Sequence, residues 1–355
     1  MSETKQIALP PRARYRLAAW LLFGTVAILA LMRFASVFGV WDWGESEGAL
    51  IAADVVSTVL FQVLGLAVIP LAVLCRFDGR PARTALRDFG FRMPHPFLLV
   101  WSAVIGLAMF CITMLISTIN TAVLLGIGFM MPRQMPEAAM TVGGFFAAIF
   151  TTAICPGFCE EVSDRGLTFH TLKNDNAARR KSDGARIVFI ALLFGLFHGN
   201  IQQTVYTFCA GLVMATLFVK TRSLFPSIIV HFTNNFLSVY MDFASDRGLP
   251  GGDFYTALGA GNVNIVGLAM LALLLSAAIL VPTIILVCKR GSERRLREDV
   301  ESGNVVYDPY TGKAVLAVPP VEEALRVQPQ DRVPVYGALI LAALMTVGTL
   351  IGGLL

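Results

Sequence analysis

The dominant feature of this sequence is a series of long apolar runs. Each run extends over about 18–27 residues, enough for one helix to cross roughly 30 Å of hydrocarbon. Only 15% of the 355 residues are charged, whereas a soluble domain normally carries about a quarter. Because lipid cannot satisfy backbone N–H and C=O groups, segments of this kind must cross it as helices. The sequence therefore predicts an all-α fold, a polytopic membrane helical bundle.

About eight to nine transmembrane helices are expected. Nine spans can be placed, of which the fifth is the shortest: residues 17–40, 49–75, 97–122, 141–163, 187–200, 201–219, 224–243, 262–288 and 334–355. Lysine and arginine gather in every second segment between the spans, and only Arg133 and Arg247 lie in the alternate segments. This bias predicts a multi-pass protein of the plasma membrane with a cytoplasmic N-terminus. The net charge of +4 then reflects topology, and no nucleic-acid partner is expected.

The chain divides into three predicted parts. These are N-terminal transmembrane helices (1–140), a core with polar residues inside its spans (141–243), and C-terminal transmembrane helices (244–355) with a cytoplasmic loop at 289–333. Two smaller elements are predicted outside the spans. Residues 82–89 form a short amphipathic helix that faces anionic lipid, and residues 304–318 form a small β-hairpin.

The segment CPGFCEEVSDRGLTFH places ionisable side chains at the end of the fourth span. On a helix, Glu161 and Arg165 share a face in the favourable acid-before-base order. Glu160 points about 100° away, toward the face of Asp164. One glutamate would thus be neutralised by Arg165, which leaves Glu160 available for chemistry. The alternative is a solvated charge cluster at a helix end.

Two histidines lie inside later spans. His198 follows Phe194 by four residues, and His231 precedes Asn235 by four. Counted from the predicted inner boundaries at 1.5 Å per residue, both histidines and Glu160 fall in the cytoplasmic half of the membrane. A single intramembrane histidine is more often a packing residue. Two of them, with a carboxamide one turn away, favour a shared site that opens to the cytosol.

These side chains form a hydrolytic set. A glutamate can take a proton from water, an imidazole can orient that water, and histidine and asparagine donors can stabilise an oxyanion. Alternatively, Glu160, His198 and His231 can bind Zn²⁺ with an open fourth position, which lowers the pKa of bound water to about 7. The helical zinc motif HExxH is absent, so no motif decides between these two chemistries.

The residues above form three motifs: first Glu160-Glu161-xxx-Arg165, second Phe194-xxx-His198 and third His231-xxx-Asn235. In this order they resemble the motifs of the CPBP (CAAX protease and bacteriocin-processing, or ABI) family of intramembrane proteases, which includes the Rce1-type prenyl-protein endopeptidases. The similarity covers roughly residues 141–243 and implies that this part is the catalytic core. The resemblance further implies the site residues. Glu160 would be the general base assisted by His198, His231 and Asn235 would form the oxyanion site, and Glu161 with Arg165 would be a supporting ion pair.

The expected function is an intramembrane endopeptidase that acts on a membrane-associated peptide or protein, of the CAAX or bacteriocin type. A metal-free glutamate mechanism that requires no cofactor is preferred, and zinc remains possible. Asp164 departs from the family pattern, which usually has apolar or aromatic residues there. The alternative is a non-catalytic binding or immunity protein that uses the same polar cavity. A transporter is disfavoured because no inverted repeat is visible.

Overall fold

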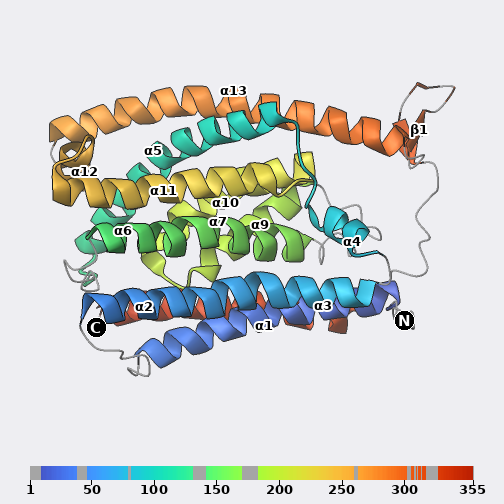
Figure 1. Cartoon of the computed structure of the whole chain (residues 1–355), viewed down its shortest axis with the longest axis horizontal. Coiled ribbons are helices and arrows are strands. Elements are labelled where there is room, and N and C mark those ends of the chain that lie inside the picture. The colour runs from blue at the N-terminus through green and yellow to red at the C-terminus, as the bar shows by residue number, and fades with distance from the viewer. Residues whose placement is uncertain are drawn as a thin grey trace.

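The computed structural model of the chain is almost entirely helical (Figure 1). It describes residues 9–37, 46–78, 81–130, 141–169, 183–259, 263–301, 305–307, 309, 311–312, 314–316 and 327–354. Within these residues the strands amount to one two-stranded hairpin, and the remaining elements are helices. The predicted all-α polytopic bundle is confirmed.

Seven helical runs in the described part of the chain are long and apolar enough to cross a membrane. They are Arg12–Met32, Gly48–Phe77, Pro96–Gly126, Val142–Leu167, Ile201–Thr221, Met270–Arg294 and Pro329–Leu354. Two further predicted spans do form helices. The first, α9 (Asp183–Phe197), has only 15 residues. The second, α11 (Phe225–Arg247), is long enough, but polar residues such as His231 and Asn235 lower its hydropathy. The count of eight to nine therefore stays a prediction.

The helices before the core are α1 (Pro11–Val37), α2 (Glu47–Thr58), the π-helix η1 (Val59–Val68), α3 (Ile69–Asp78), α4 (Ala82–Phe89) and α5 (Pro96–Gly126). The core has α6 (Val142–Ala148), the π-helix η3 (Ile149–Ile154), α7 (Cys155–Glu161), the π-helix η4 (Val162–Leu167), α9, α10 (Ile201–Thr221) and α11. The last part has α12 (Gly252–Gly259), α13 (Val263–Glu301), β1 (Val305–Tyr307), β2 (Ala314–Leu316), the 3₁₀-helix η6 (Pro329–Arg332) and α14 (Val333–Leu354).

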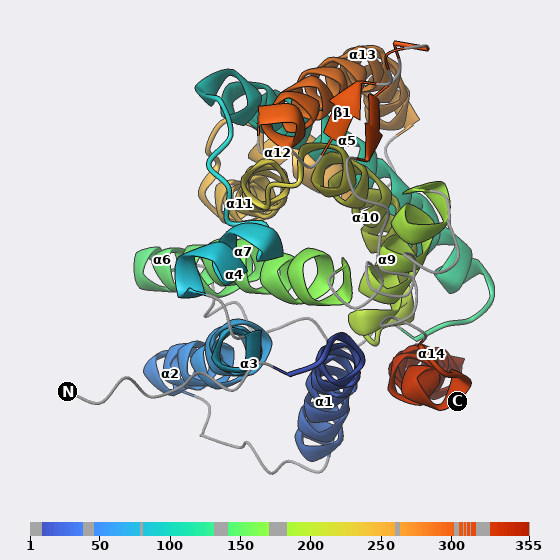
Figure 2. The same cartoon turned by 90° about the vertical axis from the view of Figure 1, so that its right-hand side faces the viewer.

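The core helices lie between two outer groups. Helices α5 and α13 cover one side of the bundle, and α1, α2, α3 and α14 cover the other, with α7, α9, α10 and α11 between them (Figures 1 and 2). Helix α1 begins and helix α14 ends at opposite ends of the bundle, as an odd number of crossings requires (Figure 1). The helices with the polar residues are thus enclosed by apolar helices.

Both small predicted elements form as a helix and a hairpin, and the contact of residues 82–89 with anionic lipid stays a prediction. Helix α4 spans Ala82–Phe89, with Arg83 exposed and Ala85 and Phe89 buried, and Gly90 ends it at a φ of 122°. Strands β1 and β2 pair antiparallel, with Val305 opposite Leu316. Both elements lie at the end of the bundle where α1 begins (Figure 1).

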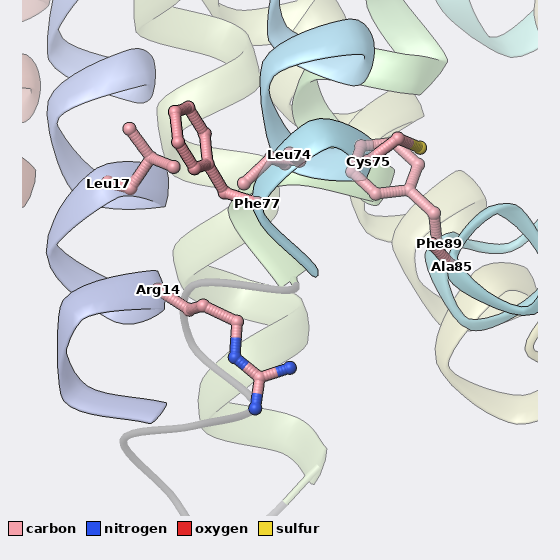
Figure 3. A pocket seen from close by; sticks show the side chains of 7 residues that line it. All are labelled: Arg14, Leu17, Leu74, Cys75, Phe77, Ala85 and Phe89. Atoms are coloured by element: carbon pink, nitrogen blue, oxygen red, sulfur yellow. The ribbon is translucent and has the colours of Figure 1, made fainter. Parts of the chain in front are cut away.

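A small pocket lies where α1, α3 and α4 meet (Figure 3). Its lining is mostly apolar with one cation, Arg14, and comprises Arg14, Leu17, Leu74, Cys75, Phe77, Ala85 and Phe89. None of the predicted site residues lines it, so this pocket is separate from the polar core.

Glycines let α11 approach its two neighbours closely. A Cβ at Gly157 on α7 would come within 3.3 Å of the Phe232 backbone, and one at Gly106 on α5 would lie 2.6 Å from Cβ of Thr233. Small residues at such contacts bring helix backbones together and place polar side chains within hydrogen-bonding reach across the interface. Helix α11 is therefore held between α5 and α7, and this packing forms the site described below.

Candidate active site

The first motif lies on one continuous helical run, residues 142–167, in which the π-helices η3 and η4 flank α7. Thr141 starts this run by accepting a hydrogen bond from the Gly144 N–H at 3.0 Å. Asp164 and Arg165 lie in η4, and both are almost completely buried. The alternative of a solvated charge cluster is therefore wrong, because neighbouring helices cover these charges. π-Helical turns are rare and frequently occur at functional sites.

Glu161 and Arg165 form the predicted ion pair. Arg165 Nη1 lies 2.7 Å from Glu161 Oε1, and both side chains are 0% exposed. Arg165 Nη1 also lies 4.0 Å from Asp164 Oδ2, so one cation faces two acids. A buried pair of this kind costs roughly 3–5 kcal/mol when one partner is removed, because the other charge is left uncompensated.

His231 connects the third motif to the first. Its Nδ1 lies 2.9 Å from Glu161 Oε1, and its Nε2 lies 3.8 Å from Glu160 Oε2. Glu161 is paired with Arg165 as an ionised carboxylate, which can only accept hydrogen bonds. Nδ1 of His231 therefore carries the hydrogen of this bond. In a neutral ring the lone pair is then on Nε2, the atom that lies 3.8 Å from Glu160 Oε2. His231 can donate through Nε2 only as an imidazolium ion.

Glu160 is the less constrained of the two glutamates. Its side chain is 12% exposed, and its Oε2 has no hydrogen-bonding partner within the part of the chain that the structure describes. Glu161, in contrast, is bonded to both Arg165 and His231. Glu161 is thus hydrogen-bonded to two side chains through its Oε1, and the availability of Glu160 for chemistry stays a prediction.

His198 is oriented by the end of helix α9. Phe194 is among the last four residues of α9, whose carbonyl groups lack an intrahelical partner. His198 Nδ1 lies 2.9 Å from the Phe194 carbonyl oxygen. Because a carbonyl only accepts, Nδ1 carries the hydrogen, and Nε2 is the acceptor nitrogen of the neutral ring. Gly199, with a φ of 55°, turns the chain, and Asn200 caps α10 by accepting from the Gln202 N–H.

The Phe194 ring is where the three motifs meet. The ring of His198 packs edge-on against it with a centroid distance of 5.0 Å, and that of His231 does so at 5.7 Å. The guanidinium carbon of Arg165 lies over the Phe194 face, 4.1 Å from its centroid. Sequence reasoning used Phe194 only as part of a spacing. Its role in packing is visible only when helices 142–167, α9 and α11 are assembled.

Asn235 lies one turn after His231 on α11 and bonds to η3. Its Nδ2 donates to the carbonyl oxygen of Thr152 at 2.9 Å, and its Oδ1 accepts from Asn234 Nδ2 at 3.1 Å. Asn234 Oδ1 in turn accepts from the Thr113 hydroxyl at 2.8 Å. Thr113 on α5 did not figure in the sequence analysis, because an isolated threonine in an apolar span carries no distinguishing pattern.

The predicted zinc ligands were tested against the geometry. Among the described residues no three His, Cys, Asp or Glu side chains are grouped closely enough to hold a metal ion. The Nδ1 atoms of His198 and His231 are both engaged in hydrogen bonds. Glu160, His198 and His231 thus do not fit a three-ligand zinc site in this arrangement, and metal dependence stays a matter for experiment.

One comparison with known proteins identifies a family. Residues 142–237 match the family described as type II CAAX prenyl endopeptidase Rce1-like. Comparison with curated proteins and comparison with solved structures returned no match. The matched range contains all six predicted site residues, and the family is one of CAAX-type membrane endopeptidases. The part of this protein that carries the polar motifs therefore matches an Rce1-like domain, in agreement with the resemblance to the CPBP family.

Proposed function

We propose that this chain is an intramembrane endopeptidase that hydrolyses a peptide bond of a membrane-associated peptide or protein, of the CAAX or bacteriocin type. The observation that carries the proposal is the Oε2 of Glu160, which has no hydrogen-bonding partner among the described residues and lies 3.8 Å from His231 Nε2, within a segment that matches a protease family. A carboxylate that keeps an acceptor oxygen near an imidazole is suited to activating water.

Glu160 is the proposed general base. It takes a proton from a water molecule while the water oxygen bonds to the substrate carbonyl carbon, which produces a tetrahedral oxyanion. When this intermediate collapses, the C–N bond breaks and protonated Glu160 returns the proton to the leaving amine. His198 assists by accepting a hydrogen bond from the water at Nε2, the nitrogen left as an acceptor by the bond to Phe194.

His231 and Asn235 are the proposed oxyanion donors. The Nδ1 proton of His231 is committed to Glu161, so His231 serves this role as an imidazolium through Nε2–H. Asn235 Nδ2 donates one hydrogen to the Thr152 carbonyl oxygen and has a second hydrogen that it can donate to the oxyanion. Fixed donors of this kind stabilise charge as it develops.

The proposed setting is the plasma membrane with a cytoplasmic N-terminus. This orientation follows from the distribution of lysine and arginine, and it places the site in the cytoplasmic half of the bilayer. The division into residues 1–140, a catalytic core at 141–243 and residues 244–355 stays part of the proposal. No cofactor is assigned to the reaction.

The proposal is tested with Glu160→Gln, which keeps the shape of the side chain and removes the base. Purified enzyme in detergent is assayed on quenched fluorescent peptides that carry a lipidated C-terminal cysteine motif or a bacteriocin leader. We expect cleavage by the native chain and a loss of at least about 100-fold in the variant, since general-base catalysis contributes about 10²–10⁴-fold. Glu293→Gln, the same change at an exposed position of α13, is the matched control.

A thermal unfolding curve for each variant separates lost chemistry from lost folding. Full activity of Glu160→Gln on a peptide that the native chain cleaves would refute the assignment. The alternative, a non-catalytic binding or immunity protein, is favoured by one observation: Asp164 adds a buried acid whose Oδ2 has no hydrogen-bonding partner among the described residues. For that function, Glu160→Gln should leave the biological effect intact.

A further inference from the structure

A chain of polar side chains connects helix α5 to the proposed oxyanion donor. The hydroxyl of Thr113 donates to Asn234 Oδ1 at 2.8 Å, Asn234 Nδ2 donates to Asn235 Oδ1 at 3.1 Å, and Asn235 Nδ2 donates to the Thr152 carbonyl at 2.9 Å. The chain crosses from α5 through α11 to η3. None of Thr113, Asn234 and Thr152 belongs to the three motifs.

The donor-to-acceptor direction of these three hydrogen bonds is determined at the η3 end. The Thr152 carbonyl can only accept, so the Asn235 carboxamide must present its NH₂ group there. Asn235 Oδ1 then faces Asn234, which must present its own NH₂ group. Asn234 Oδ1 is left facing α5 and requires a donor, and the Thr113 hydroxyl is that donor. Each carboxamide orientation thus follows from the one before it.

Thr113 is held rigidly in this position. Its side chain is buried at 4% exposure, and α5 and α11 approach closely at Gly106 and Thr233. The hydroxyl has one hydrogen and three acceptors within reach: Asn234 Oδ1 at 2.8 Å and the carbonyls of Met109 and Phe110 at 3.0 and 3.2 Å. The shortest of these contacts is the one to Asn234, which connects α5 to α11. Those two carbonyls already accept helical N–H groups, whereas Asn234 Oδ1 needs the donor.

We propose that Thr113 is a positioning residue for the Asn235 carboxamide. The inference rests on the proposed function, in which the second Nδ2 hydrogen of Asn235 stabilises the oxyanion. Without the Thr113 hydroxyl, the partly buried Asn234 Oδ1 loses its donor, and the Asn234 amide gains by turning over. A turned amide places an oxygen against Asn235 Oδ1, which displaces the Asn235 carboxamide. Thr113 thereby acts on the transition state through two intervening groups.

The test is Thr113→Val, which replaces the hydroxyl with a methyl group of similar size. We expect kcat to fall about tenfold, less than the roughly 10²–10³-fold loss that follows removal of an oxyanion donor. KM should change by less than about twofold, because the contact acts in the transition state and not in substrate binding. Thr113→Ser keeps the hydroxyl and should restore kcat to near the native value.

Thr118→Val is the matched control. Thr118 lies on the same helix, and its hydroxyl bonds to the Met114 carbonyl of α5 itself. The same substitution at Thr118 removes a hydroxyl but leaves the hydrogen bonds from Thr113 to Asn235 intact, so kcat should be native. Thr113→Ala provides a second hydroxyl-free variant if the valine variant does not fold.

An Asn235→Ala background supplies the decisive comparison. If Thr113 acts through Asn235, adding Thr113→Val to Asn235→Ala should lower the single-turnover rate no further. An equal loss in both backgrounds would overturn the inference, as would native kcat in both Thr113→Val and Thr113→Ala, or a low kcat in Thr113→Ser. These failures are distinct from failure of the proposed function, which is read from Glu160→Gln in the same assay.

Discussion

The Nδ1 atom of His231 lies 2.9 Å from Oε1 of Glu161, the same oxygen that Arg165 contacts at 2.7 Å. The second glutamate of the first motif therefore holds the histidine of the third motif as well as its own arginine. This single carboxylate ties residues 142–167 to α11. The neighbouring Glu160 keeps an oxygen without a hydrogen-bonding partner in the described part of the chain. The two adjacent glutamates thus have different surroundings, which suit Glu161 to a structural role and Glu160 to the proposed chemistry.

Glu161→Gln should destabilise the protein and abolish activity together. The change leaves the buried Arg165 cation without its main counter-charge, which costs about 3–5 kcal/mol. Thermal unfolding in detergent should show a clearly lowered midpoint, whereas Glu160→Gln should unfold near the native temperature. Glu293→Gln serves again as the exposed control. An unchanged unfolding midpoint for Glu161→Gln would contradict the proposed structural role of this carboxylate.

Phe194→Leu should lower kcat by about tenfold. Leucine keeps the site apolar but removes the ring face under Arg165, a contact of about 2 kcal/mol when desolvated, and the ring edges beside both histidines. Phe197→Leu is the matched control, because Phe197 is also buried on α9 but stacks on Phe61. We expect the two variants to unfold at similar temperatures. Equal kcat values for them would show that the Phe194 ring does not organise the site.

Dialysis against a chelator should leave cleavage unchanged. The proposed mechanism uses Glu160 as the base and takes no step through a metal ion. The measurement is the cleavage rate before and after chelation, together with the metal content of the purified protein. Loss of activity that zinc alone restores would contradict the metal-free mechanism and favour Glu160, His198 and His231 as ligands in a rearranged site.

Asp183 should contribute a pH-dependent increment to stability. Burial raises the pKa of Asp183, but the hydrogen bond from Lys220 at 3.1 Å and the charges of Lys220 and Arg186 outweigh it, so the pKa is lowered overall. A lowered pKa stabilises the folded state above the unfolded value of about 3.9 and loses this effect as the pH falls through the folded value.

Asp183→Asn should therefore be less stable than the native chain near pH 7. The difference should be at most about 1 kcal/mol because both side chains of the pair are about a third exposed. It should shrink as the pH falls below about 4 and disappear below the lowered folded pKa, where the native carboxylate is also neutral. Unfolding by denaturant at both pH values measures it. A difference that grows on acidification would contradict the assigned direction.

Relations within a single helix could be predicted from the sequence. Run length and the need to satisfy every backbone group in lipid determine the helical bundle, and the 3.6-residue period places Glu161 beside Arg165. The same local reasoning predicted helix α4 and the hairpin of β1 and β2. Motif spacing also indicated the family that matches residues 142–237.

Contacts between helices required the tertiary structure. The bond from His231 to Glu161, the position of Phe194 and the chain from Thr113 to Asn235 join residues up to 121 positions apart. They depend on the depth and rotation of each helix against its neighbours, which glycines such as Gly106 and Gly157 set by allowing close approach. A helix period relates residues on one helix only, because it contains no information about where the next helix lies. The sequence alone therefore predicted which residues would carry the chemistry, and packing decided which of them meet.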